Sequence, residues 1–499
     1  MANHLHDALF APHEGSARVF LDLPDGGRLD HGTFAALAAG FAGALTAAGL
    51  GPGDRVALQL DKSPAMLALI AGAIRAGVVF VPLNPAYTAA EVGYFVADSG
   101  ARLLLCDGAM RAALAPVAAR NGAALAVLNA DGSGSFAEAA TPGPVAPRRP
   151  DDLAALLYTS GTTGRSKGAM LSHANLLSNA EVLADAWRFS DRDVLLHALP
   201  VFHTHGLFVA TNVALLAGAR MIFLPKFDTG EVIRQLPRAS VMMGVPTFYT
   251  RLLDDPRLTR ELVRGTRLFI SGSAPLLAET HSRWQARTGH RILERYGMTE
   301  TNMNTSNPCD GERRAGTVGT ALPGVAVRIR DDAGRDLPQG EIGSIEVRGP
   351  NVFQGYWKMP ERTAAEFRSD GYFITGDLGV IDADGYLTIV GRAKDLIISG
   401  GFNVYPKEVE LALDALPGIR ESAVIGVPHP DLGEAVVAVV VPETGTAPDA
   451  AAILAALGAQ LARFKQPRHL GFRDALPRNS MGKVQKTVLR DDLRDTFAP

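Results

Sequence analysis

Short apolar runs alternate with longer alanine-rich segments up to residue 300. The run at residues 55–60 (RVALQL) precedes a helical pattern at 63–76, and the run at 78–82 (VVFVP) follows it. Helical spacing also marks residues 29–50 and 173–185. Alternation of this kind favours an open, largely parallel sheet with helices on both faces. We therefore predict an α/β fold whose large N-terminal region contains two such sheet subdomains.

The pattern changes twice in the C-terminal part of the chain. Residues 315–390 carry short strand-like runs between Gly/Asp turns, which indicates a small antiparallel barrel or meander. The chain has 499 residues, more than one usual core can hold. We predict an N-terminal region at 1–393, with two α/β sheet subdomains and a small β-barrel, followed by an α+β C-terminal domain at 394–499.

Composition and charge exclude several classes of function. The net charge is −3 with both signs spread along the chain, so no basic block indicates a nucleic-acid partner. There is no signal-peptide pattern, and the longest apolar stretch, 65–83, is interrupted by Arg75 and Pro82. Two cysteines, Cys106 and Cys309, are too few and too far apart to indicate a disulfide framework or a zinc site. We expect a cytoplasmic protein with no membrane and no nucleic-acid partner.

One glycine-rich segment is the strongest candidate for a ligand site. Residues 158–168 read YTSGTTGRSKG and follow an apolar, strand-like run at 153–157. Glycines allow close approach to a ligand, and N–H groups, hydroxyls and an ammonium that face one centre suit a polyphosphate. The spacing differs from the P-loop pattern, and a surface loop without a ligand is the alternative interpretation. The candidate ATP-binding residues are Thr159, Ser160, Gly161, Thr162, Thr163, Gly164 and Lys167.

This segment resembles the signature of the adenylate-forming superfamily, which includes acyl-CoA synthetases, peptide-synthetase adenylation domains and luciferases. The resemblance implies that the loop holds the β- and γ-phosphates of ATP. SGSAP at 271–275 and RYGMTE at 295–300 are similar to the superfamily's other nucleotide motifs, although RYGMTE alone is equally typical of a turn with a surface glutamate. By resemblance, Thr299 contacts the α-phosphate and Glu300 binds Mg²⁺, which prefers hard oxygen ligands. The residues implied to enclose the adenine are Gly272, Ser273, Ala274, Tyr296, Gly297 and Met298.

Two further motifs follow in the order that the superfamily shows. In YFITGDL, Asp377 is the candidate for binding the ribose hydroxyls, because a carboxylate at a strand end commonly accepts both, and Arg392 follows beside it. A plain turn is the alternative for TGD. In GRAKDLIISGGF the resemblance implies a hinge at Lys394, about which the C-terminal domain moves, and a coenzyme A channel lined by Gly400 and Gly401.

The last motif, NSMGKVQK, contains Lys483. Alone it is typical of an exposed basic turn, but the resemblance implies that this lysine enters the active site during adenylation. That step joins an anionic carboxylate to an anionic phosphate, and a cation placed beforehand stabilises the developing charge. Lys483 is also a candidate target for a lysine acetyltransferase, because acetylation would remove the charge.

Cationic residues near the expected acyl pocket indicate the substrate. Arg251 follows VPTFYT, Arg295 precedes YGMTE, and His203 belongs to FHTHG. A buried unpaired cation is costly, whereas arginine pairs well with a carboxylate, so these residues favour an acid with a second carboxylate. The alternative is that both arginines lie on exposed helix faces. The constellation is similar to malonyl-CoA synthetases, which implies that His203 lines the acyl site, Arg251 and Arg295 anchor the distal carboxylate, and Thr204 and Met303 bound the pocket.

The resulting prediction is an AMP-forming malonyl-CoA synthetase that uses ATP and coenzyme A as co-substrates and Mg²⁺ as cofactor. Methylmalonate is expected to be a slower substrate, because Met303 leaves little room beside the methylene group. The residues expected to act in catalysis are Lys483, His203, Thr299 and Glu300. Two alternatives stay open: a CoA ligase for another short acid, and a domain that loads a carrier protein.

Overall fold

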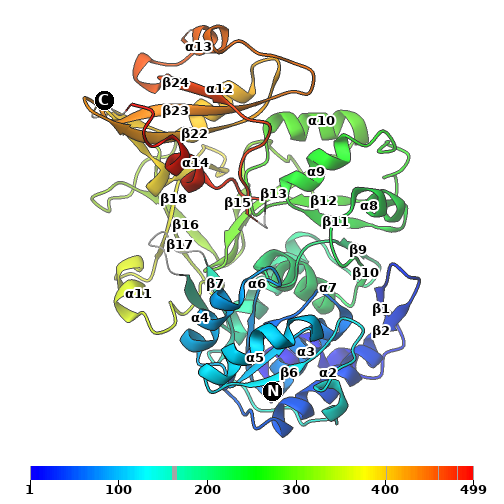
Figure 1. Ribbon diagram of the computed structural model, residues 1–499. Coiled ribbons are helices and arrows are strands. Elements are labelled where there is room, and N and C mark those ends of the chain that lie inside the picture. Colours follow the sequence, from blue (N-terminus) through cyan, green and yellow to red (C-terminus); the bar gives the residue numbers. More distant parts are fainter. Residues whose placement is uncertain (1, 160–165, 401, 459, 480–481, 498–499) are drawn as a thin grey trace.

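The computed structural model describes residues 2–159, 166–400, 402–458, 460–479 and 482–497 (Figure 1). The strands form four sheets. Two large sheets and a small meander precede the C-terminal sheet, whose orange and red elements lie together at one end of the molecule in Figure 1. Short turns of 3₁₀-helix lie between the longer elements: η1 Ala11–His13, η2 Gly108–Met110, η3 Ala137–Ala139, η5 Leu236–Arg238, η6 Ala393–Asp395 and η7 Arg463–Lys465.

The first sheet has six strands in the order β6-β5-β3-β4-β7-β8, parallel except for the antiparallel pair β7 and β8. In β3, Val56 and Leu58 face one core while Ala57 faces another, as the two-residue period of a strand requires. Helices α4 and α5 cover the face with Ala57, and α2 and α3 cover the opposite face. The bounds are β3 Arg55–Gln59, β4 Val79–Pro82, β5 Leu103–Cys106, β6 Ala124–Val127, β7 Leu153–Thr159, β8 Lys167–Ser172, α2 His31–Ala47, α3 Pro64–Ala76, α4 Ala89–Ser99 and α5 Arg111–Arg120.

The second sheet has nine strands in the order β15-β14-β13-β12-β11-β9-β10-β1-β2. Its central strands are parallel, and antiparallel strands complete both edges. The bounds are β1 Val19–Asp22, β2 Arg28–Asp30, β9 Val194–His197, β10 Arg220–Phe223, β11 Val241–Gly244, β12 Leu268–Ser271, β13 Leu293–Met298, β14 Asn302–Ser306, β15 Thr320–Ala321, α1 His4–Leu9, α6 His173–Ala186, α7 Asn212–Leu216, α8 Thr229–Gln235, α9 Pro246–Leu253 and α10 Ala278–Thr288.

Both large sheets share one hydrophobic core, to which α2, α3, α6 and α7 contribute side chains. The predicted pair of α/β sheet subdomains is therefore confirmed, with a common helical layer between them. Residues between β9 and β10 form a π-helix, η4 His205–Thr211, which α7 continues. The side chains of His197 and Thr211 bond the Gly206 carbonyl of η4, and helix propensity does not reveal these bonds.

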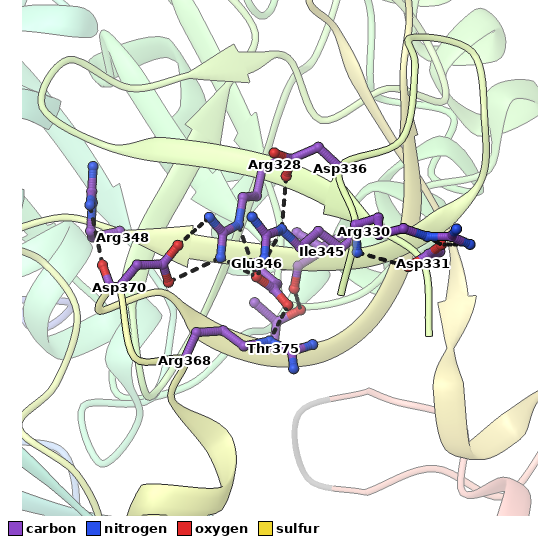
Figure 2. A network of polar contacts seen from close by, with 11 residues as sticks. Arg328, Arg330, Asp331, Asp336, Ile345, Glu346, Arg348, Arg368, Asp370 and Thr375 are labelled. Atoms are coloured by element: carbon purple, nitrogen blue, oxygen red, sulfur yellow. Dashed lines mark hydrogen bonds and ion pairs between the residues drawn. The ribbon is translucent and has the colours of Figure 1, made fainter. Parts of the chain in front are cut away.

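The meander β16-β17-β18-β19 is antiparallel, and among the described residues no pairing joins β16 to β19. Figure 2 shows how it is braced: buried Glu346 accepts bonds of 2.8 and 2.9 Å from Arg328 and of 2.7 Å from Arg368. Next to this cluster, the Thr375 hydroxyl donates to a β17 carbonyl at 2.8 Å and accepts the backbone N–H of Asp377 at 3.1 Å. These contacts hold β18 in register where it carries Asp377. The bounds are β16 Ala326–Arg330, β17 Gly343–Arg348, β18 Phe373–Ile381, β19 Leu387–Arg392 and α11 Pro360–Glu366.

The C-terminal part is the predicted α+β unit. Strand β23 is buried along most of its length, because α12 and α13 pack on one face of the sheet and α14 on the other. The bounds are β20 Ile397–Ser399, β21 Phe402–Val404, β22 Ile419–His429, β23 Gly433–Pro442, β24 His469–Phe472, α12 Pro406–Asp414, α13 Ala450–Gly458 and α14 Lys486–Leu493. Within the described residues, no helix combines the length and the apolar character that a membrane crossing requires.

Candidate active site

The predicted site residues gather beside the carboxyl ends of the parallel strands in the second sheet. Gly272 directly follows β12, and Arg295 and Tyr296 belong to the adjacent strand β13. His203 and Thr204 lie in the segment between β9 and η4. Ligands of open α/β sheets commonly bind at this edge.

The segment predicted to bind phosphate, residues 158–168, is held at both flanks by one helix. Residues 160–165, which include five predicted ATP ligands, lie outside the described residues, but their flanks do not. The Tyr158 hydroxyl donates to Asp98 at 2.6 Å, and the Tyr94 hydroxyl donates to the carbonyl of Ser166 at 2.6 Å. Tyr94 and Asp98 are four residues apart on α4, so they project from the same face. Sequence reasoning missed both, because nothing local connects α4 with this loop.

Lys167 and Glu300 meet around one tyrosine that the sequence analysis did not single out. The Lys167 ammonium lies 4.0 Å from the centroid of the Tyr356 ring and 3.2 Å from Glu366. The Tyr356 hydroxyl is 3.1 Å from Glu300 Oε1 and 2.7 Å from Glu366 Oε2, and the Thr159 hydroxyl is 3.4 Å from Glu300 Oε1. A single tyrosine proton serves only one of the two carboxylates at a time.

Glu300 fits the role of a cation ligand. Its carboxyl group is buried, and burial raises its pKa above the usual value. A cation would relieve this penalty. Among the described residues, no group of three or more His, Cys, Asp or Glu side chains could hold a metal ion. Mg²⁺ commonly takes one or two carboxylates and completes its shell with substrate phosphates and water, and a Mg²⁺ site at Glu300 stays a prediction.

Asp377 binds two partners and remains able to accept more. The Tyr296 hydroxyl donates to Oδ2 at 2.5 Å, and Arg392 Nε lies 2.7 Å from Oδ1. Burial, and then the charge of Asp377, raise the pKa of Tyr296 well above its ordinary value. The predicted position of Asp377 at a strand end is wrong, because Asp377 lies inside β18, opposite Arg392 on β19. A carboxylate offers about four acceptor positions, so the capacity for ribose hydroxyls remains.

Arg295 is a buried cation that forms no ion pair with any of the described residues. Its side chain is 3% exposed, and neither Nε nor Nη2 has a hydrogen-bond partner among the described residues. Its guanidinium lies against Gly272, where a Cβ atom would come within 2.4 Å of Cζ, so a larger residue there would displace the guanidinium. Burial lowers the pKa of Arg295 to about 9, and the group therefore stays cationic at pH 7. Such an arrangement is suited to an anionic ligand.

The histidines near Arg295 are held in the neutral form, and its other neighbours include buried Thr204 and Met303. Burial, then Lys483 and Arg295, lower the pKa of His203 to about 3, and burial lowers that of His205 well below its usual value. His205 Nδ1 is 3.2 Å from the Ser273 hydroxyl. Thr204 and Met303 are buried as well, and the Thr204 hydroxyl has no hydrogen-bond partner within the described part of the chain. Within the described part of the chain, no carboxylate is paired with Arg295.

Arg251 is placed differently from Arg295. It is exposed on α9, one turn after Thr247, and none of the ion pairs of the described residues includes it. The electrostatic causes of the pKa shifts at His203, Arg295 and Lys483 do not include Arg251 either. The structure thus supports a buried cation for Arg295 and an exposed helix position for Arg251, whose role as an anchor stays a prediction.

The C-terminal domain brings Lys483 to the site. The backbone N–H of Asn479 donates to the Lys483 carbonyl and that of Lys483 donates to Asn479 Oδ1, both at 3.0 Å. A Cβ at Gly482 would lie 3.2 Å from the Thr247 hydroxyl of α9. Burial and then Arg392 lower the pKa of Lys483, while Asp377 and Glu300 oppose that shift.

The remaining predicted residues lie at the domain junction or near Met303. Lys394 is exposed in η6, and Gly400 lies in the turn between β20 and β21 with φ +57°, rather than in a strand as expected. Gly401 is outside the described residues. Gly297 and Met298 pair with Met303 and Asn302 across β13 and β14.

Comparison with known families decides the class. The family described as AMP-binding enzyme matches residues 10–357, and the AMP-binding enzyme C-terminal domain matches residues 408–483. The chain belongs to the AMP-binding enzyme family. The predicted resemblance to the adenylate-forming superfamily is confirmed, as are the fold class and the enzyme class, an AMP-forming acid–thiol ligase.

Several members of the AMP-binding enzyme family are similar over most of their length. The ATP-bound crystal structure of MatB from Rhodopseudomonas palustris is 55% identical, with a TM-score of 0.97 and 99% of each chain covered. Feruloyl-CoA synthase from Amycolatopsis sp is 38% identical over 97% of this chain and 96% of that protein. Malonate–CoA ligase from Arabidopsis thaliana is 35% identical over 89% of this chain and 78% of that protein. These relatives act on different acids, so they do not decide the acyl substrate.

Membership of the AMP-binding enzyme family implies ATP and coenzyme A as co-substrates, as predicted. The domain boundary at 393/394, the Mg²⁺ site, the acyl substrate, the roles of single residues and modification of Lys483 by an acetyltransferase stay predictions.

Proposed function

We propose that this AMP-binding enzyme is a malonyl-CoA synthetase, which activates malonate and, more slowly, methylmalonate. The observation that supports the proposal is the buried guanidinium of Arg295, which has no carboxylate partner within the described protein. A buried cation without a counter-ion is costly, and a substrate that keeps a free carboxylate supplies one. An aryl or alkyl acid would leave Arg295 unpaired. Diacids are therefore favoured over the apolar acids that some relatives use.

The size of the pocket favours a short diacid. Met303 is buried, and its terminal methyl would lie 2.5 Å from a Cβ at Gly297, so its side chain already fills the space beside β13. We propose that Met303 and Thr204 bound an acyl pocket that accepts a methylene between the two carboxylates. A single methyl substituent is expected to be tolerated with a lower rate, and longer substituents are expected to be excluded.

In the first half-reaction, one malonate carboxylate attacks the α-phosphorus of ATP, which forms malonyl-adenylate and releases pyrophosphate. Arg295 holds the distal carboxylate, so the reacting one faces the nucleotide. Lys483 neutralises charge on the reacting carboxylate and the α-phosphate, Thr299 contacts that phosphate, and Asp377 binds the ribose. Mg²⁺ on Glu300 would screen the charge of the phosphates when bound. His203 is neutral and lines the acyl site.

In the second half-reaction, the sulfur of coenzyme A attacks the carbonyl carbon of malonyl-adenylate. The bond to the AMP phosphate breaks, a proton leaves the thiol, and malonyl-CoA and AMP are the products. We infer that the C-terminal domain turns about Lys394 between the two halves, which withdraws Lys483 and brings the Gly400 turn to the coenzyme A channel.

The test is a panel of acids in an AMP-release assay with ATP, Mg²⁺ and coenzyme A, followed by mass spectrometry of the thioesters. Malonate, methylmalonate, succinate, acetate, butyrate and ferulate cover the diacid and apolar classes. We expect the highest kcat/KM for malonate and a lower one for methylmalonate. A preference for ferulate or butyrate would overturn the acyl assignment, although the AMP-forming chemistry would remain.

A further inference from the structure

Lys62, like Arg295, is a cation without an acidic partner among the described residues, and it lies near the proposed acyl pocket. The ammonium of Lys62, just after β3, is 2.9 Å from His197 Nδ1, 2.8 Å from the His197 carbonyl oxygen and 4.3 Å from the centroid of the Phe223 ring. None of the ion pairs formed by the described residues includes Lys62. Burial alone lowers its pKa well below the usual value, so no nearby carboxylate offsets the burial. Both hydrogen bonds of the Lys62 ammonium are therefore made to His197, one to its ring and one to its backbone.

His197 connects Lys62 to the backbone of the proposed pocket wall. Its ring is fully buried at the end of β9, and Nε2 lies 2.9 Å from the carbonyl oxygen of Gly206. Because an ammonium can only donate, Nδ1 must accept, and the single ring proton of the neutral imidazole is then on Nε2. This tautomer donates to the Gly206 carbonyl. The Thr211 hydroxyl donates to the same oxygen at 2.8 Å.

Gly206 lies where a small displacement would move the pocket. It belongs to η4, and a Cβ there would be 2.0 Å from the carbonyl oxygen of Pro200, so the backbone is tightly packed. Thr204 and His205, which precede it, line the cluster around Arg295. The side-chain donors of His197 and Thr211 both bond the Gly206 carbonyl, so they contribute to the placement of this π-helix.

We propose that Lys62 is a positioning residue for the acyl pocket, which acts through His197 on the Gly206 carbonyl and so places Thr204 and His205. Lys62 follows a strand of the first sheet, and His197 ends a strand of the second. The contacts from Lys62 through His197 to Gly206 therefore also join the two subdomains at the pocket. The inference rests on the proposed function only in taking this pocket as the acyl site. It predicts that Lys62 affects the use of the acid and leaves the use of ATP unchanged.

The test uses Lys62→Met, which keeps the length of the side chain and removes its donors. Kinetics are measured in the pyrophosphate-exchange half-reaction with the acid that the wild type uses best. We expect kcat/KM for the acid to fall about tenfold, mainly through KM, which corresponds to the loss of one buried hydrogen bond. The KM for ATP should stay within about twofold. Lys226→Met, at an exposed position, is the matched control.

His197→Phe and the double variant test the contacts from Lys62 through His197 to Gly206. If Lys62 acts through His197, the double variant should be no worse than His197→Phe alone. Should His197→Phe not fold, Thr211→Val replaces it, because it removes the other donor to Gly206 and should raise the same KM. Equal changes in the KM of acid and ATP, or additive defects, would overturn the inference. A wild type that rejects malonate but shows the Lys62 effect on another acid would contradict the proposed function and leave this inference standing.

Discussion

Replacement of Arg295 by methionine should change activity and stability in opposite directions. The guanidinium is 3% exposed, and burial lowers its pKa from 12.5 to about 9. Because the charged form is disfavoured in the folded state, the charge lowers the free energy of unfolding at pH 7 by about 5 kcal/mol at most. Arg295→Met removes this penalty and keeps an unbranched side chain. We expect the variant to unfold at a higher temperature than the wild type.

The activity with a diacid should fall sharply in the same variant. Loss of a buried charged partner costs about 2–5 kcal/mol, which corresponds to about 30-fold to several thousand-fold in kcat/KM. The assay is malonate-dependent AMP release, with acetate as the comparison acid, whose weak use should not decline. Malonate should raise the melting temperature of the wild type and leave that of the variant unchanged.

Arg251→Met is the matched control, because it removes the same charge from an exposed position. A small effect on malonate KM there would indicate that Arg295 alone anchors the distal carboxylate. The reasoning is refuted if Arg295→Met retains the malonate KM of the wild type. It is also refuted if that variant is less stable, because the guanidinium would then have a partner in the free protein.

Three further predictions concern the nucleotide and the second domain. Burial and Arg392 lower the pKa of Lys483, whose ammonium is the active form, so the adenylation rate should be lost as pH rises through a value below 10.5. Pyrophosphate exchange measured against pH tests this prediction. The same loss of rate at high pH in thioester formation from preformed malonyl-adenylate would contradict it. Asp377→Asn removes the charge that faces Arg392 and Tyr296, so the KM for ATP should rise about tenfold with little change for malonate; an equal change in both KM values would argue against ribose binding. Tyr158→Phe removes the 2.6 Å bond to Asp98, so stability should fall by about 1.5–3 kcal/mol in denaturant unfolding and the KM for ATP should rise; an unchanged KM would mean that α4 does not position the phosphate loop.

The order of elements was predictable because it depends on local periodicity. The run RVALQL became β3 and the spacing at 63–76 became α3, since alternating burial and a 3.6-residue repeat are properties of neighbouring residues. The π-helix was not predictable, because the side-chain bonds of His197 and Thr211 to the Gly206 carbonyl form in the folded chain and are not part of helix propensity. The position of Asp377 inside β18 was missed for a related reason: a TGD tripeptide carries turn propensity, and pairing with β19 overrides it.

The amino-acid sequence by itself determined the family, the α/β class and the residue types needed for adenylation, because glycine-rich loops and motif spacing are written in short segments. Only the tertiary structure decided which cations are desolvated: it buried Arg295 against Gly272 and left Arg251 exposed on its helix. It also brought Tyr356 and Glu366 to Lys167, and Lys62 to His197, from distant parts of the chain. Burial and partnership are properties of the packed whole, so the energy of a charge, and with it the preference for an acid, follows from the fold.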